Sequence, residues 1–338
     1  MAKRSRIDQL ERAVQAMLSR PAGTRVRPGK DLERSLAPLL RIAQNLRDLP
    51  REDFKVRLKT NLERSLQMEN AAKQAVSPGA SKGAEASGYR TIAPYIIVPR
   101  AGEFIEFLTN AFAGTERFRV GREPGSKFIM HAEVAIGNSV IELADANEQI
   151  PAAPMAIHLY VEDADSVFAR AIDAGATSIY EVGDHVSGDR QGAVRDPFGN
   201  LWYIAMIQGW TPGPEGVPSV QPYLHLRGAE KMIPFLEDAF GAVVQGHVPR
   251  SPEGHVLHAT VQIGDNTLEI DEAHEEFQPM PCHLHLHVDD ADAMYARAIK
   301  AGATSLDPPS DKPYGRSGGV KDAFGNSWYV TSPLQQKT

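Results

Sequence analysis

Residues 161–178 read VEDADSVFARAIDAGATS, and residues 288–305 read VDDADAMYARAIKAGATS. Each stretch is followed by a matching segment, which reads DPFGNLWY at residues 196–203 and DAFGNSWY at residues 322–329. Similarity that returns at one interval is the signature of a duplicated structural unit. The sequence therefore predicts two tandem domains that share one fold.

The duplication divides the chain into four segments. Domain A is predicted over residues 90–209 and domain B over residues 218–333. Residues 1–75 place apolar side chains at three- and four-residue steps, which predicts a basic helical region. Residues 76–89 are rich in alanine, serine and glycine, a composition typical of a flexible linker.

Within each domain, the predicted order of elements is one strand, one helix and further strands, and this unit occurs twice. In domain B we expect a strand at 220–226, a helix at 228–240, strands at about 256–263 and 266–272, a strand at 282–288, a helix at 290–301 and a hairpin that turns at 324–326. Hairpin-linked strands favour mixed sheets. The predicted fold class is α+β: paired βαβββ units form curved mixed sheets around a cavity, and an N-terminal helical region precedes them.

Composition and charge indicate the cellular compartment and the possible partners of the protein. The single cysteine, Cys282, excludes an internal disulfide and fits a reducing compartment. No apolar run approaches the roughly 20 residues that cross a bilayer, so we expect no membrane contact. We expect a cytoplasmic protein that is monomeric or homodimeric. The net charge is −7, yet residues 1–75 are basic. The basic helices therefore present a solvated face, dock on the chain's own acidic body, or bind a protein or nucleic-acid partner.

The duplicated region resembles the vicinal oxygen chelate superfamily of glyoxalase I, fosfomycin-resistance enzymes, extradiol dioxygenases and bleomycin-resistance proteins, and within it the PhnB-like group. The resemblance covers residues 90–333. It is carried by Pro94-Tyr95 and Pro222-Tyr223, the helix end Ala239–Ala242, His131-Ala132 and His258-Ala259, and the two Asp-x-Phe-Gly-Asn-x-Trp hairpins. It implies a small-molecule ligand.

In metal-using members of that superfamily, each βαβββ unit supplies one ligand from its first strand and one from its last. Carried over to domain B, these positions hold Gln221, Glu269, His283 and Tyr329, whereas domain A holds Ala93, Glu142, Ala156 and Tyr203. The resemblance thus implies a Zn²⁺, Ni²⁺ or Mn²⁺ site on Gln221, Glu269 and His283. Tyr329 stands where a glutamate ligand belongs. This set does not suit an iron dioxygenase, which uses two histidines and a carboxylate.

Other residues are candidates for binding and catalysis. Glu269 shares one strand face with Thr267 and Asp271, so it would hold the metal or shuttle a proton, with Tyr329 as an acid. His283, His285 and His287 alternate along one strand and share a face, which favours one ligand and two pocket-lining imidazoles. The remaining candidates for binding substrate are His158, Tyr95, Tyr223 and, in a glycine-rich loop expected over the cavity, Arg316.

Three functions remain open. The first is a metal-dependent lyase or isomerase that acts on vicinal oxygens in domain B. The second is a metal-free protein that binds or sequesters a ligand, and the third is a ligand-sensing regulator that uses the basic helices.

The pairing of the βαβββ units is also open, because they can pair within a domain or between domains. Pairing between domains would divide the predicted ligand set. Glu142 would join His283 and Tyr329, while Gln221 and Glu269 would face Ala156 and Tyr203.

Overall fold

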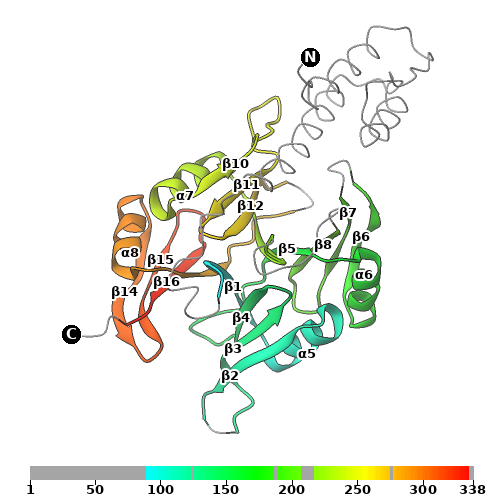
Figure 1. Cartoon of the computed structure of the whole chain (residues 1–338), viewed down its shortest axis with the longest axis horizontal. Coiled ribbons are helices and arrows are strands. Elements are labelled where there is room, and N and C mark those ends of the chain that lie inside the picture. Colours follow the sequence, from blue (N-terminus) through cyan, green and yellow to red (C-terminus); the bar gives the residue numbers. More distant parts are fainter. Residues whose placement is uncertain (1–88, 124, 186–188, 207–216, 275–276, 335–338) are drawn as a thin grey trace, which may run out of the picture. The chain divides into compact units, whose positions relative to one another are not determined.

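The computed structural model describes residues 89–123, 125–185, 189–206, 217–274 and 277–334 (Figure 1). The chain divides into two compact units, Met1–Gln74 and Ala75–Thr338, and every described residue belongs to the second. The predicted N-terminal helices therefore lie outside the described residues. None of the helices in the described part is long and apolar enough to span a membrane.

Two mixed sheets of eight strands each form the framework, which confirms the predicted class of fold. Sheet 1 has the order β14-β15-β16-β13-β1-β4-β3-β2. Its strands are β1 (Ile92–Val98), β2 (Thr115–Gly121), β3 (Ile129–Ile136), β4 (Ser139–Asp145), β13 (His283–His287), β14 (Thr304–Lys312), β15 (Gly315–Lys321) and β16 (Ser327–Ser332).

Sheet 2 repeats this arrangement, with the order β10-β11-β12-β9-β5-β8-β7-β6. Its strands are β5 (Ala156–Tyr160), β6 (Thr177–Asp184), β7 (Arg190–Arg195), β8 (Leu201–Met206), β9 (Val220–Leu226), β10 (Val243–Gln245), β11 (Ala259–Ile263) and β12 (Asn266–Glu272). Strands β1–β8 form the first copy of the repeat, and strands β9–β16 form the second.

Each sheet combines one unit from each copy. In the middle of sheet 1, β1 pairs antiparallel with β13, so that Tyr95 lies opposite His283. In sheet 2, β5 pairs antiparallel with β9, so that Ala156 lies opposite Tyr223. Of the two pairings that the sequence left open, the structure has the one between copies, and this decides which side chains share a face.

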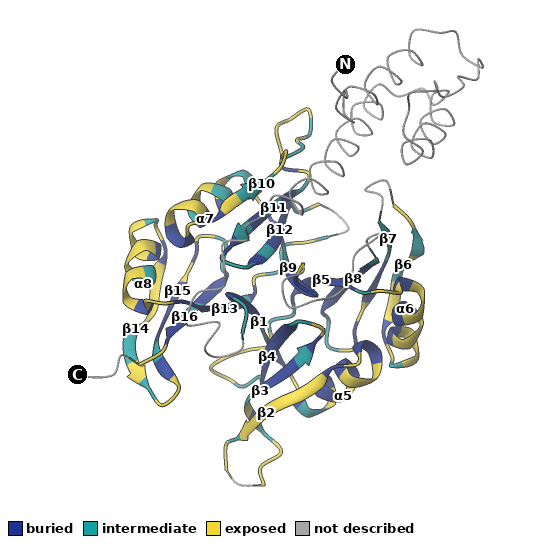
Figure 2. Cartoon of the chain, in the orientation of Figure 1, coloured by how far each residue is buried: buried dark blue, intermediate teal, exposed yellow. Residues whose placement is uncertain are grey.

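The helices pack within each copy rather than between copies. Helix α5 (Ala101–Phe112) packs on α6 (Ala164–Asp173), and α7 (Met232–Phe240), which follows the 3₁₀ turn η2 (Ala229–Lys231), packs on α8 (Ala291–Lys300). Their outer faces are exposed and their inner faces are buried (Figure 2). The ring of Phe112 lies 4.5 Å from that of Trp202, and Phe240 lies 4.7 Å from Trp328. Each copy thus joins its two units through helices while contributing to both sheets.

The repeated hairpin motif is held by its aspartate. The carboxylate of Asp196 accepts hydrogen bonds from Trp202 Nε1, from Asn200 Nδ2 and from the backbone amides of Phe198 and Asn200. Asp322 does the same in the second copy. Buried polar groups are costly unless they are paired, so this network explains why the motif keeps Asp, Asn and Trp together.

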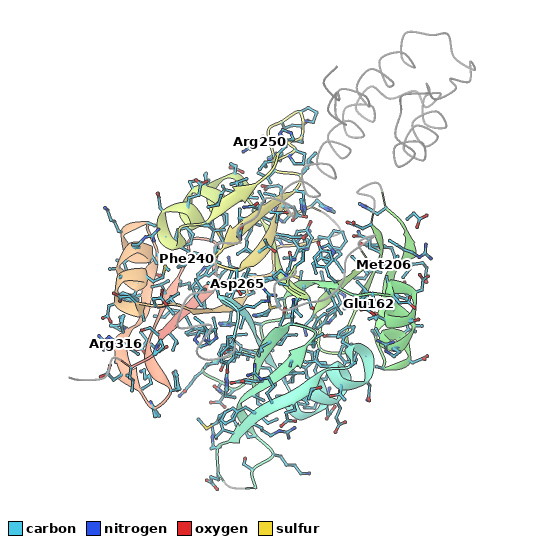
Figure 3. All side chains as sticks on the ribbon, viewed as in Figure 1. Glu162, Met206, Phe240, Arg250, Asp265 and Arg316 are labelled. Carbon is cyan, nitrogen blue, oxygen red and sulfur yellow. The ribbon has the colours of Figure 1, made fainter. Side chains whose placement is uncertain are left out.

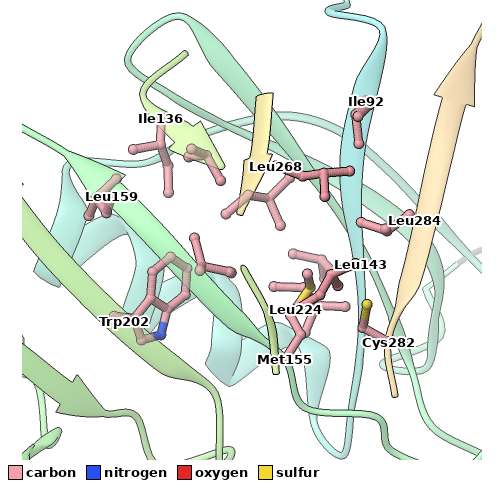
Figure 4. Packing of buried hydrophobic residues seen from close by; sticks show 14 of the residues in the cluster. Ile92, Ile136, Leu143, Met155, Leu159, Trp202, Leu224, Leu268, Cys282 and Leu284 are labelled. Carbon is pink, nitrogen blue, oxygen red and sulfur yellow. The ribbon is translucent and has the colours of Figure 1, made fainter. Parts of the chain in front are cut away.

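One hydrophobic core extends across both sheets. Leu143 and Leu284 of sheet 1 belong to the same buried cluster as Leu159, Trp202 and Leu268 of sheet 2 (Figure 4). Polar contacts also join the two sheets, because both the backbone amide and the hydroxyl of Thr91 donate to Asp265 Oδ1 at 2.8 Å. The two sheets are therefore held together over a continuous interior.

Candidate metal and ligand sites on the two sheets

A buried carboxylate lies at the centre of a polar cluster on sheet 1. Glu142 of β4 is 2% exposed. Its Oε2 lies 2.7 Å from Nδ1 of His285, and its Oε1 lies 3.0 Å from Nε2 of His287. Both imidazoles come from β13, on the far side of β1. Ala93 of β1 lies opposite His285 and carries only a methyl group, so the imidazole can reach across β1.

Further side chains hold the two imidazoles in place. Nε2 of His285 lies 2.7 Å from the hydroxyl of Thr331, which donates to Ser317 Oγ. The ring of His287 is stacked on Tyr89, with centroids 4.1 Å apart, and the Tyr89 hydroxyl donates to Glu133. Partners of this kind fix the orientation of a ligating ring.

The charges of this cluster follow from burial and from the imidazoles. Burial alone would raise the pKa of Glu142, but His285 and His287 outweigh it and hold the pKa well below its usual range. Burial lowers the pKa of His287, although Glu142 opposes the shift. The cluster therefore offers a charged carboxylate and, at His287, a neutral imidazole near pH 7, which are the protonation states that metal ligands require.

The donor set fits a divalent transition-metal ion. One ligand atom from each of Glu142, His285 and His287 lies within 4.8 Å of the others. Two imidazoles and one carboxylate suit Fe²⁺, Mn²⁺, Zn²⁺ or Ni²⁺, and small side-chain adjustments would bring all three to bond lengths of about 2.0–2.2 Å. A second group, Glu230, His255 and Glu272, lies largely exposed. There the Glu272 carboxylate already accepts hydrogen bonds from the backbone at the start of η2.

Aromatic rings lie beside the cluster on sheet 1. Tyr95 makes edge contacts with Tyr329 at 5.9 Å and with His131 at 5.7 Å, and His283 is stacked on Tyr329 at 6.1 Å. Burial raises the pKa values of both tyrosines, so they keep their protons. Burial lowers the pKa of His283, and its buried Nδ1 has no hydrogen-bond partner among the described residues.

Sheet 2 carries a related cluster at the matching positions. Both carboxylate oxygens of Glu269 lie 3.0 Å from Nδ1 of His158, and the hydroxyl of Tyr160 donates to Oε1 at 3.1 Å. Glu269 matches Glu142 and His158 matches His285, but Tyr160 stands where sheet 1 has His287. A neutral phenol is a poorer metal ligand than an imidazole. The two sheets therefore differ in their capacity to hold a metal.

A second polar network distinguishes sheet 2. His225 Nδ1 lies 2.6 Å from Asp271 Oδ1, and His225 Nε2 lies 3.0 Å from the Tyr203 hydroxyl. The Tyr223 hydroxyl donates to Asp271 Oδ2 at 3.0 Å, and burial raises the pKa of Tyr223 well above its usual value. Sheet 1 has Ile97 and Ala144 at the positions of His225 and Asp271, so it lacks the partners for this network.

The structure does not bring the predicted metal set together. Gln221 and Glu269 lie on sheet 2, with Gln221 bonded to the backbone of Pro218, whereas His283 lies on sheet 1. Tyr329 also lies on sheet 1, whereas Glu269 lies on sheet 2. From the sequence, we had expected these two residues to act together in catalysis. The reason is the pairing between copies, which moves β13 and β16 away from β12.

The sequence reasoning missed the grouping of Glu142 with His285 and His287. The alternation of the three histidines correctly predicted one shared face, but its ligand was assigned to His283. The useful signal was the pairing between copies, which already placed β13 with Glu142. The set that results contains two histidines and a carboxylate, the pattern that the sequence interpretation had set aside.

Arg316 lies away from these clusters. The segment expected to form a loop is strand β15, and Arg316 is on its helix-facing side, where Asp292 of α8 and Asp311 hold the guanidinium (Figure 3). Arg190 of the first copy is held in the same way by Asp165 and Asp184. Both arginines therefore fix a strand to a helix. Their N–H groups bind aspartates, away from the clusters described above.

Comparisons with known proteins agree with this architecture. The sequence profile of the Glyoxalase/Bleomycin resistance protein/Dioxygenase superfamily matches residues 90–204 and 226–330, and the chain belongs to this superfamily. Uncharacterized proteins from Mycobacterium bovis and Mycobacterium tuberculosis are 35% identical over 125 residues, which is 33% of this chain and 80% and 72% of theirs. Glyoxalase I from Zea mays has a similar structure, with a TM-score of 0.54 and 16% identity over 71% of this chain and 92% of that one. That likeness concerns the fold.

Proposed function

We propose that this protein binds a small molecule next to a divalent metal ion on sheet 1, with Glu142, His285 and His287 as the protein ligands. The observation that carries the proposal is the buried Glu142 carboxylate, which faces one imidazole with each of its oxygens. Burying a charge in this way is costly unless it is paired or coordinates a metal. The predicted site in domain B thus becomes a site built from both copies.

The surrounding residues favour a proton-transfer reaction on an oxygen-rich substrate. Three protein ligands leave positions open, and a bound ion would supply Lewis-acid polarisation of a substrate oxygen. Tyr95 and Tyr329 keep their protons and can donate hydrogen bonds to such an oxygen. His283 is neutral and can accept a proton. This combination suits a lyase or isomerase that acts on vicinal oxygens.

The experiment is metal analysis of the full-length protein purified without chelators. We expect about one equivalent of divalent metal per chain, and we expect chelator treatment to lower the melting temperature until Zn²⁺, Ni²⁺, Mn²⁺ or Fe²⁺ is restored. Glu142→Gln should abolish metal retention, whereas the matched variant Glu269→Gln should keep it. Absence of metal, together with no thermal shift on titration with any of the four ions, would overturn the proposal.

Metal-free ligand binding is the second candidate, and the composition of sheet 2 favours it. Tyr160 and Tyr203 replace the ligand types that a metal needs there, while Tyr223 and His158 remain on the same face. A protein that binds its ligand in this way would keep full affinity after chelation. The regulatory alternative depends on residues 1–75, and it would be tested by asking whether deletion of residues 1–88 abolishes binding of a protein or nucleic-acid partner.

A further inference from the structure

Three side chains of the types that bind metals meet on the helix side of sheet 2, away from the polar clusters described above. Glu230 comes from η2, His255 from the loop between β10 and β11, and Glu272 from the last position of β12. One ligand atom from each lies within 4.8 Å of the others. Side chains alternate along a strand, so Glu272 shares the face of Ile270, which belongs to the main core, and not the face of Glu269. The group is therefore separate from the sheet face that carries the polar clusters.

The Glu272 carboxylate holds the start of η2. Its Oε1 accepts from the backbone amide of Gly228 at 2.8 Å, while its Oε2 accepts from the amides of Ala229 at 2.9 Å and Gly228 at 3.0 Å. A carboxylate has about four lone-pair positions, so these bonds leave room for a cation. Nδ1 of His255 lies 4.0 Å from Glu272 Oε2. That distance is too long for a hydrogen bond, but one ion with bonds of about 2.0–2.2 Å could join the two atoms.

The Glu230 carboxylate lies against the same end of η2. A Cβ added at Gly228 would be 3.7 Å from Glu230 Oε1, so the side chain turns back towards the residue whose amide binds Glu272. Its Oε2 is a buried atom without a hydrogen-bond partner among the described residues. A carboxylate oxygen in that position is costly unless it is paired or coordinates a metal, and the second carboxylate nearby adds repulsion. A divalent cation held by Glu230, His255 and Glu272 would relieve both costs.

The first copy of the repeat shows what this corner of the fold needs for its own stability. At the three matching positions it has Gly102, Phe128 and Asp145. Asp145 alone anchors the matching helix, because its carboxylate accepts from the backbone amides of Ala101 at 2.6 Å and Ile129 at 2.7 Å. A single carboxylate is therefore enough to hold the start of the helix. The second carboxylate and the imidazole of the second copy are additions that the fold does not require.

We infer that Glu230, His255 and Glu272 form a metal site of their own, which binds a divalent transition-metal ion such as Zn²⁺ and fixes the loop between β10 and β11 to the start of η2. One imidazole with two carboxylates suits Zn²⁺ or Mn²⁺, whereas Mg²⁺ and Ca²⁺ prefer oxygen ligands alone. The loop is a hairpin closed by a bridge between Arg250 and Val256 (Figure 3).

This loop site is independent of the ion proposed on sheet 1, with which it shares no ligand. Because the group is largely exposed, we expect its ion to exchange during purification and to fill the site when it is added. The loop site is therefore measured by titration, whereas the site on sheet 1 is measured by the metal that the purified protein retains.

The test is calorimetric titration of the full-length Glu142→Gln protein with Zn²⁺ after metal has been stripped and the chelator removed, since this substitution disables the site proposed on sheet 1. We expect one equivalent of Zn²⁺ to bind. His255→Phe, which copies Phe128, and Glu230→Gln should each weaken binding at least tenfold, because even a disturbed ligand orientation costs about 10- to 100-fold. The matched control His247→Phe, at an exposed histidine of the same loop, should bind Zn²⁺ as its parent does.

Hydrogen exchange followed by mass spectrometry reports where the ion binds. Zn²⁺ should slow the exchange of amides in residues 246–258 of the Glu142→Gln protein, and His255→Phe should remove this protection. With sheet 1 intact, the native protein should bind one Zn²⁺ more than the single variant His255→Phe. The protection should appear whether or not sheet 1 retains a metal, so failure of the proposed function leaves this inference standing.

Three results would overturn the inference. The first is equal Zn²⁺ binding by the native protein and by both the His255→Phe and Glu230→Gln variants, which includes no binding at all. The second is an equal loss of binding in His247→Phe, since this would indicate scattered surface histidines rather than one site. The third is Zn²⁺ binding that leaves the exchange of residues 246–258 unchanged, since the ion would then not fix the loop.

Discussion

Replacing His287 by tyrosine should separate metal binding from stability. The substitution gives sheet 1 the residue that sheet 2 already has at the matching position, Tyr160. The phenol can donate to Glu142 as Tyr160 donates to Glu269, at 3.1 Å in place of the present 3.0 Å contact from His287. One hydrogen bond thus replaces another, while a metal ligand is lost.

The two effects are measured separately. Tyrosine is larger than histidine, and overpacking of a buried site typically costs about 1–3 kcal/mol, so the free energy of unfolding of the metal-free protein should fall by no more than about 3 kcal/mol. Substitutions that only disturb the orientation of a ligand lower metal affinity about 10- to 100-fold. Loss of a ligand itself should therefore exceed roughly 100-fold, or about 2.8 kcal/mol at 1.4 kcal/mol per factor of ten.

The assay is competition of the full-length protein with a metal-sensitive dye, paired with urea unfolding in the presence of chelator. His287→Tyr should lose metal affinity, while its unfolding in chelator should remain cooperative, with only the loss that overpacking allows. The reciprocal change Tyr160→His should give sheet 2 a second metal equivalent. If His287→Tyr binds metal as tightly as the native protein, the ligand assignment is refuted, and a variant that fails to fold in chelator would show that the residue acts through folding.

Three further predictions concern the framework. Gly264 has a φ of +60°, and a Cβ there would lie 2.1 Å from Thr91 Oγ1, so Gly264→Ala should destabilise the protein by about 2–4 kcal/mol in thermal unfolding. The control Gly254→Ala has open space around it and should cost about 1–2 kcal/mol from backbone strain alone. Equal losses would contradict the close approach of Gly264 to Thr91. Asp196→Asn should cost about 2–4 kcal/mol in urea unfolding, because the new amide NH2 would face the donors of Asn200 Nδ2 and Trp202 Nε1 and both hydrogen bonds would be lost. Unchanged stability would show that this network does not hold the hairpin. Cys282 is buried, and burial raises the pKa of its thiol. A thiol reagent should therefore label Cys282 very slowly in the native protein and rapidly in guanidinium. Rapid labelling of the native protein would disprove this burial.

Much of the fold could be predicted because the local signals were strong. In the second copy the strand expected at 220–226 is β9 with the same bounds, and the helix expected at 290–301 is α8, which Asp290 caps by accepting from Ala293. The segment around Arg316 was misread, because glycines that allow close strand contact also resemble a loop. Gly318 is one such case, since a Cβ there would meet the backbone of Pro309 at 2.9 Å.

The candidate sites were less accessible to prediction. The residue types were found, since Glu269, His158, His285, His287, Tyr95 and Tyr223 all lie in polar or aromatic clusters on the two sheets. Their grouping was not found, because it depends on contacts between strands more than a hundred positions apart.

The sequence by itself determined the βαβββ unit and the turn of each hairpin, because both depend on residues close together in the chain, and it showed the duplication as a repeat of matching segments. The tertiary structure alone decided that β1 pairs with β13 and β5 with β9. Both copies present similar apolar strands at these edges, so local patterns favour pairing within and between copies equally. The choice follows from the packing of the whole interior, and it brings Glu142 to His285 and His287 while it leaves Glu269 with His158 and Tyr160.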